Sequence, residues 1–176
     1  MKRSWESILT LSVVHFMLFP ETTPGTGPVV ETIEKLAKDD FLGGVEITRI
    51  KSAEDRAAVR SIAAQSGLKL GFGAQPALLS TGLSLNDLDE DRRLAAVELI
   101  KGCVDEAVEM GCARMSFLTG RDPGDADRPR ALDALNTSMH TLCQYAEDQG
   151  LALAIETFDR DVDKKSLLGP SDLSAQ

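Results

Sequence analysis

The stretch Gly150-Leu-Ala-Leu-Ala-Ile-Glu-Thr-Phe-Asp-Arg-Asp161 decides the fold class of this chain. Within it, five apolar residues run from Leu151 to Ile155, and Glu156 follows directly. An apolar run of this length, bounded by turn signals, is typical of a strand that is buried on both faces. Open α/β sheets and β/α barrels place their reactive groups where such strands end. We therefore expect a parallel-sheet protein with Glu156 at a strand exit.

The rest of the chain repeats this alternation of strand and helix. Apolar runs predict further strands at 8–16, 43–48, 68–74 and 113–118. Helical periodicity predicts helices at 29–40, 52–67, 89–110 and 130–149, with a long loop at 77–88. Strands that alternate with amphipathic helices indicate parallel pairing through right-handed crossovers. The helix at 89–110 is expected to bury an apolar stripe that begins at Leu94, and Ser171 is a candidate cap for a further helix.

Composition and charge narrow the class of function. The chain has 176 residues, of which 43% are hydrophobic and 27% charged, as in a globular protein with one domain and a sizeable core. Its formal net charge is −9. An acidic chain without a basic cluster repels phosphate backbones, which argues against binding to nucleic acid or an anionic membrane. A small phosphorylated substrate remains compatible, because a single Arg can hold a phosphate.

The cysteines and the N-terminus bear on location. The three cysteines form no Cys-x-x-Cys pair, and Cys103 and Cys143 lie beside predicted apolar stripes. We therefore expect buried free thiols and a cytoplasmic protein. The basic Met1-Lys-Arg start and the apolar residues after Ile8 imitate a secretory signal, but no Ala-x-Ala-like cleavage site follows. This apolar run is also too short to span a bilayer, so we expect it to be the first strand.

Polar residues at the strand exits are the candidate site residues. In a parallel β/α fold all strand exits face the same side, so residues there converge although they are distant in sequence. The exits carry His15, Glu46, Gln75, Ser116 and Glu156. An imidazole with two carboxylates suits divalent metal binding or proton transfer beside a carbonyl group.

Some of these residues have alternative roles. Glu46 can pair with Arg49 or Lys51, and His15 can be a hydrogen-bonded core residue. Asp159 begins an alternation of aspartates that imitates a calcium loop but lacks the Gly and the final Glu of an EF-hand. A charged, solvated loop with Arg160 reaching a substrate is the interpretation we favour.

Three short motifs resemble those of a known family, the sugar-phosphate isomerases and epimerases of the xylose-isomerase-like β/α-barrel superfamily. The motifs are His15-Phe-Met in the first strand, Gly44-Val-Glu46-Ile in the second, and Leu153-Ala-Ile-Glu156-Thr-Phe-Asp159 in the fifth. The resemblance implies a (β/α)8 TIM barrel that acts on a sugar or sugar phosphate. It also implies a divalent metal, either Mn, Mg, Co or Zn, at the strand exits.

The resemblance assigns roles to individual residues. Glu156 matches the glutamate that binds the metal and serves as one acid/base in moving a proton next to a sugar carbonyl. His15 and Glu46 match positions that line the substrate pocket. Gln75, which follows the third strand, joins them as a candidate substrate-binding residue.

The chain departs from the family in the number of strands. The family's other metal ligands come from strands six to eight, whereas residues 1–176 predict about five β/α units, as in an N-terminal part of a barrel truncated after strand five. We therefore expect an incomplete ligand set, little or no activity of this chain alone, and exposed sheet edges that favour homo-oligomers. Two alternatives stay open: an abasic-site endonuclease of the same superfamily and a non-catalytic α/β binding domain.

Overall fold

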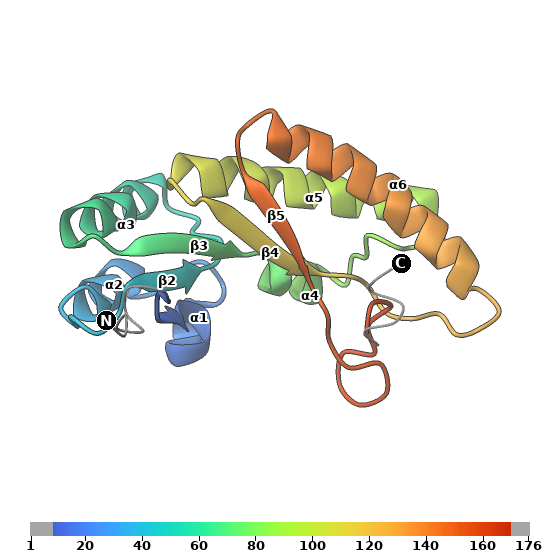
Figure 1. Ribbon diagram of the computed structural model, residues 1–176, viewed down its shortest axis with the longest axis horizontal. Helices are drawn as coiled ribbons and strands as arrows, with labels where there is room; N and C mark the ends of the chain where they lie inside the picture. The colour runs from blue at the N-terminus through green and yellow to red at the C-terminus, as the bar shows by residue number, and fades with distance from the viewer. Residues whose placement is uncertain (1–8, 170–176) are drawn as a thin grey trace, which may run out of the picture.

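A computed structural model describes residues 9–169, which form a single parallel sheet with helices packed against it (Figure 1). The strands lie in chain order, β1-β2-β3-β4-β5, and every neighbouring pair is parallel. Within the described residues β1 and β5 have one strand neighbour each, so the sheet is open. The predicted fold class, part of a TIM barrel, is confirmed. The strands are β1 (Ser12–Val14), β2 (Gly44–Ile47), β3 (Lys69–Gly73), β4 (Arg114–Leu118) and β5 (Ala152–Glu156).

Long helices connect the strands, and short helical turns lie at the strand exits. The core is formed where these helices meet the sheet face that carries Val45, Phe72 and Phe117. Burial of such side chains is the main stabilising contribution to the fold. The long helices are α2 (Val29–Leu36), α3 (Ala53–Ser66), α5 (Glu90–Glu109) and α6 (Arg128–Glu147), and the short ones are α1 (His15–Leu18), η2 (Pro20–Thr22) and α4 (Gln75–Thr81).

The opposite face of the sheet carries small and polar side chains. Because side chains alternate along a strand, Glu46 on β2 and Gly73 on β3 lie on the face away from the packed core. The strand register places Gly73 beside Ser116 and Leu118 beside Glu156. This face is the one that a closed β/α barrel turns inward.

Helix termini follow the sequence signals. The Ser52 hydroxyl accepts a hydrogen bond from the backbone N–H of Asp55 and so caps α3, which ends at Gly67 with a positive φ of 77°. The Asp89 carboxylate caps α5 in the same way by accepting from Arg92 N–H. Both helices were predicted with nearly these limits.

Several local predictions are wrong. The first strand ends at Val14, and His15 already begins α1. Residues 75–81 form α4, because Pro76 fits the first turn of a helix, where its missing N–H costs nothing. Leu94 is 46% exposed, and the neighbouring Arg93 is buried instead, where its guanidinium donates to Ser138 Oγ on α6.

Strand β5 and Cys143 also differ from expectation. The apolar run was predicted to be buried on both faces, but Ala152 and Ala154 are exposed because their side chains lie on the sheet face opposite the packed core. Cys143 is exposed, whereas Cys103 and Cys112 are buried, and burial raises the pKa of each of these two thiols to about 12. None of the helices in residues 9–169 combines the length and apolarity needed to cross a membrane. The basic start of the chain and Ser171 lie outside the described residues.

Candidate functional site

Glu46, Gln75 and Phe16 converge above the backbone of Gly73. A Cβ atom at position 73 would lie 2.7 Å from Gln75 Oε1, 2.8 Å from Glu46 Oε1 and 3.1 Å from Phe16 Cε1. A methyl group there would push the ends of the Glu46 and Gln75 side chains aside, so their close approach to the backbone depends on residue 73 being a glycine. The structure thus brings together two of the predicted site residues, from β2 and from the start of α4.

The Gln75 amide is fixed by Ser116. Its Nε2 donates to Ser116 Oγ at 3.0 Å, and the residue is only 8% exposed. Its Oε1 is buried and has no hydrogen-bond partner among the described residues. A buried acceptor without a partner is costly, which is compatible with a ligand that donates a hydrogen bond there. Ser116 was named from the sequence only as a strand-exit residue, and its role as the partner of Gln75 depends on the pairing of β3 with β4.

Glu156 ends β5 on the same face as Glu46. Both carboxylates are half-buried, and neither has a hydrogen-bond or ion-pair partner within residues 9–169. Burial raises the pKa of Glu46, and the negative charge of Glu156 raises it further. The environment therefore favours the protonated form of Glu46, which is the state that a proton donor needs.

His15 has partners of its own. It is 2% exposed, its Nε2 lies 2.8 Å from Thr32 Oγ1, and its Nδ1 lies 3.4 Å from Thr22 Oγ1. Burial lowers its pKa, while the charge of Glu21 acts in the opposite direction. No hydrogen bond joins His15 to Glu46, Gln75 or Glu156 in the described structure. The ring instead ties the turn after β1 to α2 and so holds the neighbouring Phe16 above Gly73.

Neither Arg49 nor Lys51 pairs with Glu46 within the described residues, so that alternative is wrong. Arg49 has another partner. Its Nε lies 3.2 Å from Glu106 Oε2, a buried carboxylate on α5 that also accepts from the backbone N–H of Ile50. The pair fixes the loop that follows β2. The Glu46 carboxylate is therefore left without a cation partner among residues 9–169.

The loop after β5 is organised by Asp159. Its carboxylate accepts backbone N–H groups from Val162, Asp163 and Lys164, at 2.8, 2.6 and 3.1 Å. These hydrogen bonds, with that from Lys164 the strongest, lower the pKa of Asp159 to about 2. Arg160 was expected to reach a substrate, but its Nη2 donates to Leu167 O and its Nε lies 3.4 Å from Asp122 Oδ2.

The described residues do not form a metal centre by themselves. Nowhere in residues 9–169 do three or more His, Cys, Asp or Glu side chains gather closely enough to hold a metal ion. Glu156 lies close enough to Glu46 for its charge to raise the pKa of that residue, but within residues 9–169 no third ligand joins the two carboxylates. The residues present therefore do not supply the ligand set that a divalent ion needs.

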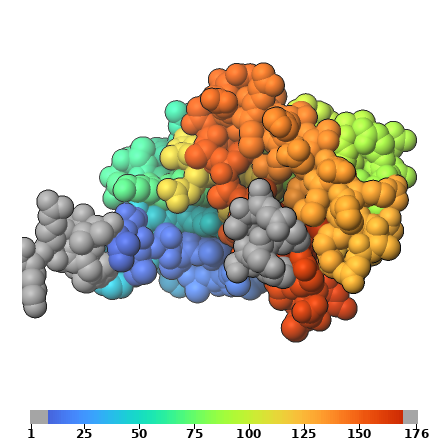
Figure 2. All heavy atoms as spheres, turned by 45° about the vertical axis from the view of Figure 1, so that its right-hand side comes forward, coloured from blue at the N-terminus to red at the C-terminus, as the bar shows by residue number. Residues whose placement is uncertain are grey.

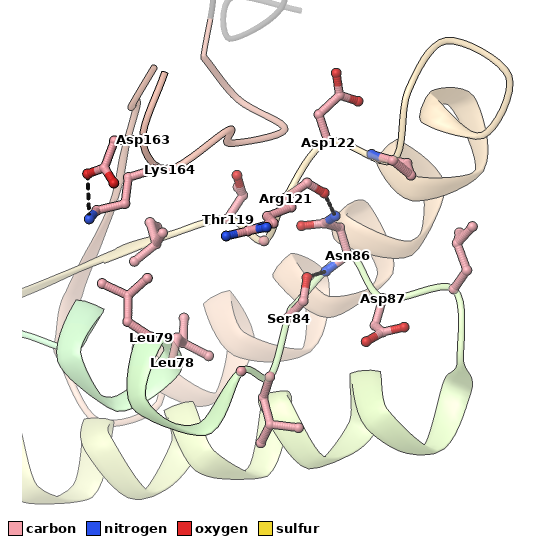
Figure 3. A pocket seen from close by; sticks show the side chains of 16 residues that line it. Leu78, Leu79, Ser84, Asn86, Asp87, Thr119, Arg121, Asp122, Asp163 and Lys164 are labelled. Atoms are coloured by element: carbon pink, nitrogen blue, oxygen red, sulfur yellow. Dashed lines mark hydrogen bonds and ion pairs between the residues drawn. The ribbon is translucent and has the colours of Figure 1, made fainter. Parts of the chain in front are cut away.

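A cavity of about 630 Å³ lies beside this cluster, at the carboxyl ends of β3 and β4 (Figure 3). It is bounded by α4, the 82–89 loop, the 119–123 loop and part of the segment that follows β5. That segment, red in Figure 2, packs on the β4 exit, where Leu167 N–H donates to Gly120 O at 2.9 Å. No sequence pattern predicts this cavity, because its walls come from α4 and three separate loops.

Comparison with known proteins identifies the architecture. The family model described as xylose isomerase-like TIM barrel matches residues 30–164. No curated protein matches the chain significantly. The fold is similar to a D-tagatose 3-epimerase-like protein, with a TM-score of 0.67 and 17% identity, over 85% of this chain and 53% of that one.

Two further solved structures share the fold. A D-psicose 3-epimerase matches with a TM-score of 0.68 and 16% identity, over 86% of this chain and 53% of its own. An AP endonuclease, family 2, from Brucella melitensis matches with a TM-score of 0.68 and 14% identity, over 91% and 60% of the two chains. The chain therefore spans about half the length of the first two structures that it matches.

Proposed function

The chain belongs to the xylose isomerase-like TIM-barrel family, and from this premise we propose that its site serves a sugar isomerase or epimerase. The observation that carries the proposal is the convergence of Glu46 and Gln75 above Gly73, on the face where Glu156 ends β5. Isomerisation and epimerisation of a ketose both require a proton to leave and return at a carbon next to the carbonyl group. A pair of carboxylates without cation partners suits that transfer.

Each residue has a distinct proposed role. Glu156, at the end of β5, is the acid/base that exchanges the proton with the sugar. Glu46, on β2, contacts the sugar from the other side of β3 and β4. Gln75 Oε1 accepts a hydrogen bond from a sugar hydroxyl, which would satisfy an acceptor that is otherwise buried without a partner. His15 lines the pocket indirectly, through the position that it gives to Phe16.

Glu156 is the only residue of this site that the proposal assigns as a metal ligand. In the family resemblance a divalent ion polarises the sugar carbonyl, and Glu156 would be one of its ligands. Because the described residues hold no group of three ligands, we assign no reaction step to the metal. We accordingly expect the 176-residue chain to bind a ketose but to turn it over slowly or not at all. A cytoplasmic location, where the buried thiols stay reduced, belongs to the same proposal.

The alternative activities have less support. An abasic-site endonuclease shares the fold, but the net charge of −9 repels a DNA backbone. A non-catalytic binding domain would leave the Gln75 acceptor and the two unpaired carboxylates without a role. Size-exclusion chromatography bears on this last alternative, because a defined dimer would favour it.

Binding of an uncharged ketose tests the proposal directly. Saturation-transfer NMR and a titration with D-fructose and D-psicose should show binding to the 176-residue chain. Glu156→Gln and Glu46→Gln should each weaken it about tenfold or more, because a hydrogen bond to a charged group is lost. Glu34→Gln, an exposed glutamate on α2, is the matched control and should change nothing.

Turnover is measured in the same samples. Deuterium exchange from D2O into the ketose, followed with added Mn²⁺, should be slow or absent. Failure of both sugars to bind, or equal binding by all variants, would contradict the proposed site. Rapid epimerisation by the chain alone would contradict the expected impairment.

A further inference from the structure

Arg121 is unusual among the charged residues of the cavity. Its guanidinium projects into the cavity (Figure 3) and has no ion-pair partner within the described part of the chain. The acidic residues of the lining are all neutralised in pairs, namely Asp87 with Arg92, Asp122 with Arg128, and Asp163 with Lys164. The cavity therefore offers one uncommitted positive charge although the chain as a whole is acidic.

Neutral polar groups accompany this charge. Asn86 is 4% exposed, its Nδ2 donates to Arg121 O at 3.0 Å, and its Oδ1 is buried without a partner. Ser84 Oγ accepts the backbone N–H of Asn86 at 3.3 Å, which leaves its hydroxyl proton available to a ligand. A cation, a hydroxyl donor and a carbonyl acceptor fit a ligand that has both an anionic group and hydroxyl groups.

The cavity adjoins the proposed site. Leu118 lines the cavity and is the register partner of Glu156 on the neighbouring strand. Adjacent strands lie about 4.8 Å apart, so the cavity starts one strand spacing from the Glu156 position. A ligand that contacts Glu156 with its carbon chain can therefore reach the cavity with its far end.

We propose that this cavity binds the anionic group of a sugar derivative, with Arg121 as the charge partner, while the carbon chain extends toward Glu156. The inference rests on the proposed function and adds the substrate class, a sugar that carries a phosphate or a carboxylate. Arg121 forms paired hydrogen bonds to the planar or tetrahedral anion, which Arg does better than Lys. Asn86 Oδ1 accepts a hydroxyl of the same ligand.

The Arg121 side chain can be replaced without disturbing the structure of the 119–123 loop. Arg121 O accepts from Asn86, and residue 121 bridges to Ser166, so the backbone at this position is held independently of the side chain. Gly120 brings the two loops together, because a Cβ there would lie 1.6 Å from Ser84 Oγ. Arg121→Gln should therefore fold normally, which circular dichroism and thermal unfolding will verify.

Calorimetric titrations of the 176-residue chain test the inference. The ligands are a ketose phosphate (D-fructose 6-phosphate), a sugar acid (D-gluconate) and the uncharged D-fructose. We expect the chain to bind at least one charged ligand about tenfold more tightly than fructose, and Arg121→Gln to abolish this preference while fructose affinity is unchanged. Arg130→Gln, which removes an exposed cation of α6 outside the cavity, is the control and should keep the preference.

Each outcome has a defined meaning. Preference for the phosphate or for the acid, lost in Arg121→Gln, supports the cavity and identifies the anion. Absence of any preference, or a preference that survives in Arg121→Gln, overturns the inference even when fructose binding still depends on Glu156. If Arg121→Gln abolishes the preference but Glu156→Gln leaves fructose binding intact, the proposed function fails and the anion site stands.

Discussion

At the scale of single residues, His15 shows how the surroundings of a predicted site residue depend on distant parts of the chain. The sequence left two roles open for it, in the pocket or in the core. The structure surrounds its two ring nitrogens with the hydroxyls of Thr22 and Thr32 and buries the ring. Those threonines lie 7 and 17 residues farther along the chain, so no local pattern could have revealed them.

This environment makes stability depend on pH. Burial lowers the pKa of His15 in the folded state, so below about pH 6.5 the unfolded chain binds a proton that the folded chain resists. The free energy of unfolding should therefore fall as the pH drops from 7 to 5. His15→Gln should lose about 1 kcal/mol at pH 7, because a buried hydrogen bond is weakened, but should show a smaller decrease toward pH 5. Urea unfolding at both pH values measures the difference, and parallel curves for the two proteins would contradict it.

At the scale of elements, β3 contributes its backbone rather than a side chain to the site. The sequence pattern Gly71-Phe-Gly73 lacks the third glycine of a dinucleotide-binding fingerprint. In the sheet, Phe72 packs into the core while both glycines face the opposite side. Gly73 alone has the site residues directly above it, and a Cβ at Gly71 would have nothing within 4 Å.

The two glycines provide a matched pair of variants. Gly73→Ala should displace the Glu46 and Gln75 side chains, weaken ketose binding about tenfold or more, and cost about 1–3 kcal/mol of stability from overpacking. Gly71→Ala should leave binding unchanged and add up to about 1 kcal/mol, because alanine has less freedom in the unfolded chain. Ketose titration and chemical unfolding of both variants check this. Equal effects of the two changes would show that the space above Gly73 is not used by a ligand.

The limits of the helices were predicted more accurately than the residues that they bury. The limits of α3 and α5 follow from local chemistry, and the side chains of Ser52 and Asp89 cap the two helices at the predicted starts. The buried stripe of α5 was misplaced at one end, where Leu94 is exposed and Arg93 is buried. Helical periodicity predicts the buried face of a helix only to within about one residue. Here Arg93 faces inward because its Nη1 donates a hydrogen bond to Ser138 Oγ on α6 at 2.9 Å. The partner helix decided which residue faces inward.

At the scale of the whole molecule, the open sheet dominates the physical behaviour. Strand β5 presents an unpaired edge within the described structure, and Ala152 and Ala154 on it are exposed. Unpaired N–H and C=O groups beside small apolar side chains template pairing with another chain. We therefore expect the protein to self-associate as its concentration rises.

A charge on the edge should oppose this association. Ala152→Glu places a carboxylate on β5 opposite Arg114 of β4, so it should leave the fold intact and reduce the associated fraction severalfold. Ala64→Glu adds the same charge to an exposed position of α3 and serves as the control. Sedimentation velocity at several concentrations measures the effect. A dimer that is equally stable in both variants would place the interface elsewhere.

The sequence by itself determined the alternation of strands and helices, the parallel sheet and the placement of Glu46, Gln75 and Glu156 in or just after strands. These follow from periodicity and turn chemistry, which are local properties. The family came from the resemblance of three short motifs, at His15, Glu46 and Glu156. Only the tertiary structure decided that Gln75 is held by Ser116, that Glu46 and Gln75 approach the backbone of Gly73, and that Arg121 projects into a cavity between α4 and three loops. These relations join residues from different strands and loops, and a one-dimensional pattern does not contain the distances between them.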